Sequence, residues 1–169
     1  MIDKYGQPNE FTNSLLVWHN NGPWERTIVH RDGVAHNFPR KHSDVLQQFI
    51  KYRVPVDKFD DLAAFDGSLY PDRTRGELSA KSDREEMNVL ALNLADDIIR
   101  GKKTVEQARQ YYDRAATLSL TGKSDPYISR MNFRSGTLPT ADEDKQLKHK
   151  EIGNGGASEM EKEPGSENQ

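Results

Sequence analysis

A cluster of histidines in the first third of the sequence offers the side chains best suited to bind a metal ion, since imidazole nitrogen is a common zinc ligand. The four members are His19, His30, His36 and His42. The pair Asp32-Gly33 suits a two-residue type I′ hairpin turn, which would pair Val29 with His36. His30 and His36 would then point to opposite faces of the hairpin and could not share one ion. No closely spaced carboxylates complete a ligand set, so the sequence predicts no metal site.

Two short motifs match catalytic patterns but lack the residues that must accompany them. His-Arg-Asp at 30–32 followed by Asn37 has the spacing of a protein-kinase catalytic loop, yet the chain has neither a GxGxxG loop nor a DFG motif. Gly-Lys-Ser at 122–124 resembles the end of a Walker A loop, but Thr117 stands where the first glycine is required. The chain has no cysteine, which excludes thiolate metal sites and a cysteine nucleophile. No catalytic residue is predicted.

The polar segment 66–82, DGSLYPDRTRGELSAKS, is the best candidate for a binding site. It is long for a connection without structure of its own, and loops held by a rigid scaffold often carry function. The arginines could clamp a carboxylate or phosphate while a carboxylate acts as general base. The predicted site residues are Asp72, Arg73, Arg75, Glu77 and Asn88. Asn88 falls inside the apolar arc of the helix that follows, so its amide must be hydrogen-bonded internally or face a polar cavity.

Residues 15–38 are typical of a short antiparallel sheet. Residues 15–19 form an apolar run that ends at the turn-forming sequence Asn-Asn-Gly-Pro. Segments 25–31 and 34–38 flank the expected turn at Asp32-Gly33. The sequence therefore predicts a three-strand β-meander.

The rest of the body is typical of helices. Asp44 is expected to cap a helix over 44–52, and a shorter helix follows over 57–65. Ser82 and Glu85 have the spacing of a capping box for the longest helix, and Gly101 suits its left-handed end. The apolar residues of this helix span an arc of about 200°, wider than the ~100° stripe of a surface helix, which predicts a central position. A further helix is expected from a capping box at Thr104 to near Gly122.

The composition changes sharply after Phe133. Both Trp, all six Tyr and all six Phe lie at or before this residue. Segment 134–169 contains few apolar residues, too few to offset the entropy of ordering it, so we expect a disordered tail. The tail carries the whole net charge of −3. The sequence thus predicts a single α+β domain over 1–133 and a disordered acidic tail over 134–169.

The segment Thr74 to Arg109, TRGELSAKSDREEMNVLALNLADDIIRGKKTVEQAR, resembles the core of a group of small uncharacterised bacterial proteins. The resemblance covers under a quarter of the chain. It implies an intracellular bacterial origin and brings no fold, activity or site residue with it.

Together these patterns predict an α+β fold in which a short N-terminal antiparallel β-meander packs on about four helices. The leading functional hypothesis is a cytoplasmic, non-enzymatic protein-interaction or regulatory module that has another protein as partner and no cofactor. The alternative is a small enzyme that acts on an anionic metabolite through segment 66–82. A charge-balanced body argues against nucleic-acid binding, and no apolar run reaches the ~20 residues needed to cross a membrane.

Overall fold

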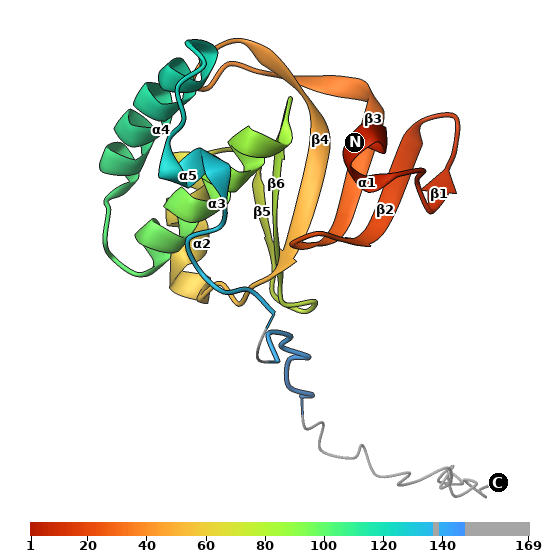
Figure 1. Cartoon of the computed structure of the whole chain (residues 1–169). Coiled ribbons are helices and arrows are strands. Elements are labelled where there is room, and N and C mark those ends of the chain that lie inside the picture. The colour runs from red at the N-terminus through yellow and green to blue at the C-terminus, as the bar shows by residue number, and fades with distance from the viewer. Residues whose placement is uncertain (137–138, 148–169) are drawn as a thin grey trace, which may run out of the picture.

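The computed structural model describes residues 1–136 and 139–147, which form an antiparallel sheet with helices on one face (Figure 1). The sheet has six strands in the order β1-β2-β3-β4-β6-β5. The strands are β1 Glu10–Phe11, β2 Leu15–Asn21, β3 Trp24–His36, β4 His42–Lys51, β5 Leu69–Asp72 and β6 Glu77–Ser82. The helices are α1 Ile2–Tyr5, the 3-10 turn η1 Val56–Lys58, α2 Phe59–Phe65, α3 Glu85–Ile99, α4 Val105–Leu120 and α5 Pro126–Ser129.

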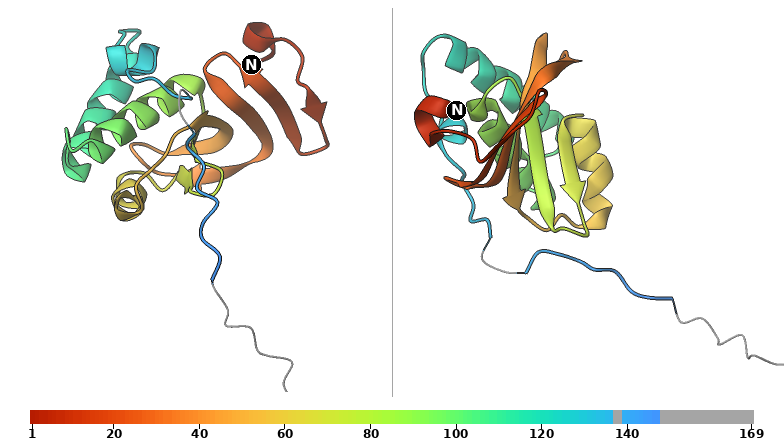
Figure 2. Two further views of the ribbon diagram at one scale, coloured as in Figure 1. Left: turned by 90° about the horizontal axis from the view of Figure 1, so that it is seen from below. Right: turned by 90° about the vertical axis from the view of Figure 1, so that its right-hand side faces the viewer.

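The alternation of buried and part-exposed residues along β4 shows how the sheet uses its two faces. Asp44, Leu46, Gln48 and Ile50 are buried against the helices, while the residues between them point to the opposite face. This period of two is the pattern of a strand with one covered face. Figure 1 shows α2, α3, α4 and α5 gathered on that side of β4, β6 and β5. Figure 2 shows that β1 and β2 extend past the layer formed by α3 and α4.

Helix α3 is the centre of the helical layer. Every residue from Met87 to Ile98 is buried, and the helix contacts α4, α5 and β6. The central position predicted from its wide apolar arc is therefore confirmed. No helix in the described part of the chain is long and apolar enough to span a membrane.

The predicted three-strand meander on about four helices is wrong, because the sheet has six strands and three of them come from segments that were predicted as a helix or a loop. Residues 44–51 of the segment predicted as a helix over 44–52 belong to β4. Their apolar residues 45, 46, 49 and 50 fit a helical spacing, but both faces of the strand carry apolar side chains, which hides the period of two. Segment 66–82, predicted as a loop, contains β5 and β6.

The predicted hairpin turn at Asp32-Gly33 is also wrong, since both residues lie within β3. The β2–β3 turn is at Gly22-Pro23, where Asn21 pairs with Trp24. The register of β3 against β4 shifts between Val29 and Val34, as in a β-bulge. A Cβ atom on Gly33 would lie 2.3 Å from the Ser43 Oγ. This glycine therefore permits close approach of a neighbouring strand.

The helix-end signals were partly correct. Gly101 has a φ of +69° just after the last turn of α3, and Thr104 and Gln107 form the predicted capping box of α4. The Ser82–Glu85 box is wrong, because Ser82 ends β6 and α3 begins only at Glu85. Ser82 is instead held in the sheet by its pairing with Leu46 of β4.

Part of the predicted tail lies beside the turn between β5 and β6. The Asp142 N–H donates to the Arg73 carbonyl at 3.1 Å, and the Arg53 Nη2 lies 3.6 Å from the Asp142 carboxylate. Asp144 is paired with Arg73 as well. Residues 137–138 and 148–169 lie outside the described residues, so the disordered tail and the domain boundary at 133 stay predictions.

Candidate metal site

Four of the five predicted site residues come together on the uncovered face of the sheet. Asp72, Arg73, Arg75 and Glu77 line an open hollow of about 560 Å³ with Phe49 and Tyr70 in its wall. Their charges are already paired within the chain. Arg26 Nη2 donates to the Glu77 carboxylate at 2.8 Å, Arg75 Nε lies 3.7 Å from the Asp72 carboxylate, and Arg73 contacts Asp144. Binding an anion here would require breaking these pairs, so the site stays a prediction that the geometry does not favour.

Asn88 lies apart from the other four, on the helical side of the sheet. Its Nδ2 donates to the Leu46 carbonyl at 3.1 Å and to the Gln48 Oε1 at 3.0 Å. These bonds tie α3 to β4. The internal hydrogen bonding expected of a buried amide is thus confirmed for its nitrogen.

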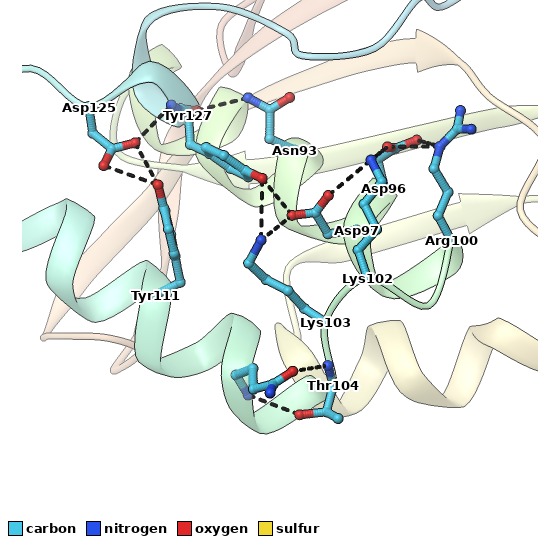
Figure 3. A network of polar contacts seen from close by, with 11 residues as sticks. Asn93, Asp96, Asp97, Arg100, Lys102, Lys103, Thr104, Tyr111, Asp125 and Tyr127 are labelled. Carbon is cyan, nitrogen blue, oxygen red and sulfur yellow. Dashed lines mark hydrogen bonds and ion pairs between the residues drawn. The ribbon is translucent and has the colours of Figure 1, made fainter.

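A second polar network joins the end of α3 to α4 and α5 (Figure 3). Asp97 accepts from the Tyr127 hydroxyl at 2.7 Å and is paired with Lys103 and Lys102. Asp96 is paired with Arg100 and accepts from the Tyr52 hydroxyl at 2.7 Å. Each carboxylate in the network has partners within the chain. The carboxylates of the network therefore serve to hold elements together.

A third group of polar side chains lies at the other end of the sheet, where β3 passes into β4. His36 is the last residue of β3, His42 is the first of β4, and the two are directly paired in the ladder. Asp44 lies two residues further along β4, on the same face as His42. One potential ligand atom from each residue lies within 4.8 Å of the others. We call His36, His42 and Asp44 the His–His–Asp cluster.

The carboxylate of Asp44 is the focus of the cluster. Its side chain is only 1% exposed, and both imidazoles approach it. The His36 Nδ1 lies 3.3 Å from the Asp44 Oδ2, and the His42 Nε2 lies 3.0 Å from the Oδ1. A positive partner stabilises a carboxylate this deeply buried, because burying an unpaired charge is costly.

The hydrogen bond on the far side of His42 fixes which of its nitrogens faces Asp44. The His42 Nδ1 lies 2.7 Å from the Arg40 carbonyl, which can only accept, so Nδ1 carries a proton. In a neutral imidazole the Nε2 then presents a lone pair. That lone pair faces the Asp44 Oδ1, which has no hydrogen-bond partner among the described residues. Two acceptors 3.0 Å apart require a cation between them, either a proton or a metal ion.

Asp66 and Ser68 orient the other two members of the cluster, His36 and Asp44. The His36 Nε2 faces the Asp66 Oδ1 at 3.7 Å, which leaves Nδ1 directed at Asp44. The Ser68 hydroxyl donates to the Asp44 Oδ2, and the Ser68 N–H donates to the Asp66 Oδ1 at 2.8 Å. Metal-binding histidines commonly direct their second nitrogen at a carboxylate or a backbone carbonyl. Both histidines of the cluster follow this rule.

Asp66 follows α2 and is nearly as buried as Asp44. Burial raises its pKa, and the neighbouring Asp44 carboxylate acts in the same direction, whereas the Ser68 N–H and His36 oppose them. Two buried carboxylates beside two imidazoles therefore make a site in which added positive charge is favourable.

The sequence analysis predicted no metal site, because His30 and His36 were expected on opposite faces of a hairpin. It did not consider that His36 could pair with His42 across two strands. The structure keeps His30 away from the cluster, beside Gln47 and Lys81. Asp44 was assigned to a helix cap. The signal that could have revealed the site is the His-Ser-Asp sequence at 42–44, because residues two apart in a strand share a face.

Comparison with known proteins identifies no relative of the chain. No protein-family model matches it, and neither a curated protein nor a solved structure is detectably similar. Any function must therefore be inferred from the site itself.

Proposed function

We propose that the protein binds one divalent transition-metal ion through the His36 Nδ1, the His42 Nε2 and the Asp44 carboxylate. The observation that carries the proposal is the convergence of the His42 Nε2 and the His36 Nδ1 on the buried Asp44 carboxylate, at 3.0 and 3.3 Å, with the His42 Nδ1 already tied to the Arg40 carbonyl. An ion between these atoms would satisfy both imidazoles and the carboxylate.

The donor set indicates the class of ion. Imidazole nitrogens suit zinc and its first-row neighbours, whereas magnesium and calcium prefer oxygen ligands alone. In a tetrahedral site with bonds of ~2.0–2.1 Å, ligand atoms lie roughly 3.4 Å apart. The His42 Nε2 and the Asp44 Oδ1, 3.0 Å apart, would have to separate slightly to reach this spacing, whereas ligand atoms at the 4.8 Å limit of the cluster would have to approach by roughly 1.4 Å. Side-chain rotation in half-buried His36 and His42 can supply that movement.

Three protein ligands leave a coordination position open, as in zinc sites that bind a further ligand or a water molecule. This supports a metal-dependent binding or catalytic role more than a structural one. A metal centre of this kind is compatible with the interaction module and with the anion-binding enzyme inferred from sequence. The cytoplasmic location and the protein partner both stay predictions.

Zinc titration of the tag-free, full-length chain tests the proposal. We expect one equivalent of Zn²⁺ to bind per chain in calorimetry. At a free concentration of 100 times the Kd, zinc stabilises the fold by about 2.7 kcal/mol, which should raise the unfolding temperature by at least about 5 °C. A chelator should reverse the shift, and Mg²⁺ should not produce it. Absence of saturable zinc binding would contradict the proposal.

A further inference from the structure

A small pocket adjoins the His–His–Asp cluster and shares a residue with it. The pocket has a volume of about 200 Å³, and His42 is part of its wall. Residues 39–42 run along this wall and end at the cluster. A molecule in the pocket would therefore lie next to the metal ligand that carries the proposed function.

The charged side chains that line the pocket are mostly cationic. Arg40, Lys41 and Arg84 contribute positive charge, against the single carboxylate of Asp83. Lys41 is exposed and makes no ion pair with any residue in 1–136 or 139–147. The buried Arg84 Nε has no hydrogen-bond partner among the same residues and lies 3.6 Å from the Asp83 carboxylate. Lys41 is thus unpaired among the described residues, and Arg84, although ion-paired with Asp83, has a buried Nε–H that lacks an acceptor there.

The rest of the wall is apolar and includes one phenol. Pro39, Met87 and Leu120 supply apolar surface, and the ring of Tyr112 completes it. Burial raises the pKa of the Tyr112 hydroxyl well above its ordinary value, and the nearby Asp66 carboxylate adds to this effect. The hydroxyl therefore stays protonated and can donate a hydrogen bond.

We infer that the pocket binds a small organic anion, an oxyanion group joined to an apolar or aromatic part, whose oxygen takes the open position on the metal ion. The inference rests on the proposed metal site. Lys41 and Arg84 would hold the anionic group, while Pro39, Met87 and Leu120 would cover the apolar part. At ~30 Å³ per water, the pocket has the volume of about seven water molecules, which suits a ligand the size of a single ring with its carboxylate.

Two successive titrations of the full-length chain separate this inference from the metal site. The chain is first titrated with Zn²⁺, and the zinc-loaded protein is then titrated with benzoate or with acetate. We expect benzoate to bind at least ten times more tightly than acetate, because its ring buries apolar surface that acetate lacks. Benzoate should bind at least ten times more weakly to the metal-free chain, since the coordinate bond to zinc is then missing.

Charge-removing variants test the lining of the pocket. Lys41→Met and Arg84→Gln should each weaken benzoate binding about tenfold, the typical effect of losing a charge-assisted hydrogen bond. Lys123→Met removes a similar exposed charge outside this pocket and should leave benzoate binding unchanged. All three variants should bind zinc as the unaltered chain does.

The outcomes are distinct. Zinc binding without saturable benzoate binding would overturn the pocket inference and leave the metal site standing. Benzoate binding that is equal with and without zinc, or unaffected by both Lys41→Met and Arg84→Gln, would also overturn it. Absence of zinc binding would overturn the proposed function and, with it, this inference.

Discussion

His42→Ala should weaken zinc binding by more than about a hundredfold. Replacing residues that merely orient metal ligands typically costs 10- to 100-fold in affinity, and removal of a ligand itself should cost more. The variant also leaves Asp44 without its nearest positive partner, since the His42 Nε2 lies 3.0 Å from the carboxylate. The measurement is calorimetric titration with Zn²⁺, accompanied by circular dichroism to verify that the metal-free variant is folded.

His19→Ala is the matched control for this prediction. His19 is an imidazole on β2 whose side chain is 42% exposed and paired with Glu10, away from the cluster. Its replacement should leave zinc affinity and stoichiometry unchanged. Equal zinc affinity in His42→Ala and the unaltered chain would show that zinc binds elsewhere.

Asp97→Asn should lower the free energy of unfolding by about 3 kcal/mol at pH 7, because it removes the charge that a buried network is built around. The Asp97 side chain is 4% exposed and is contacted by Lys103, Lys102 and Tyr127 (Figure 3). Replacement leaves the part-buried Lys103 ammonium without its main partner. Chemical denaturation of both proteins measures the difference.

The lowered pKa of Asp97 makes the stability of the fold depend on pH. Burial acts to raise the pKa of Asp97, but the hydrogen bonds from Lys103 and Tyr127 outweigh it and hold the pKa below its ordinary value of 3.8. A group with a lowered folded-state pKa stabilises the fold above its unfolded pKa, and that contribution is lost as pH falls through the folded value. The stability difference between the unaltered chain and Asp97→Asn should therefore shrink steadily from about pH 5 downward.

Asp113→Asn provides the control for this second prediction. Asp113 is a half-exposed carboxylate on α4 that lies 3.9 Å from Arg40. An exposed pair of this kind contributes less than about 1 kcal/mol. A loss of 1 kcal/mol or less for Asp97→Asn as well would show that the network contributes little to stability.

The parts of the fold that the sequence predicted correctly are those set by local chemistry. Gly101 ends α3 because a left-handed residue is needed there, and Thr104 with Gln107 caps α4 through hydrogen bonds three residues apart. The central position of α3 followed from an apolar arc too wide for a surface helix. These signals depend on neighbours along the chain and need no knowledge of the sheet.

The errors arise where partners distant in sequence decide the structure. Asp44 has the chemistry of a helix cap, but pairing with β3 and β6 makes its segment a strand. Gly33 has the chemistry of a turn, but it is needed where β4 passes close to β3. Local propensity is readily overridden by pairing of this kind.

The candidate site was missed for the same reason. His36 and His42 become neighbours only once β3 and β4 pair, and Asp66 and Ser68 reach them only when α2 packs on the same face. Asp66 and Ser68 belong to segment 66–82, but the site predicted within it used other residues. The charged residues chosen within it, Arg73 and Arg75 among them, face the other side of the sheet or its edge.

X-ray absorption spectroscopy at the zinc edge of the zinc-loaded, full-length chain tests the central claim most directly. The account predicts a first shell of nitrogen and oxygen atoms at about 2.0–2.1 Å, with outer-shell scattering from two imidazole rings that falls to one ring in His42→Ala. A first shell made of oxygen atoms alone, without imidazole scattering, would contradict a site built from His36, His42 and Asp44.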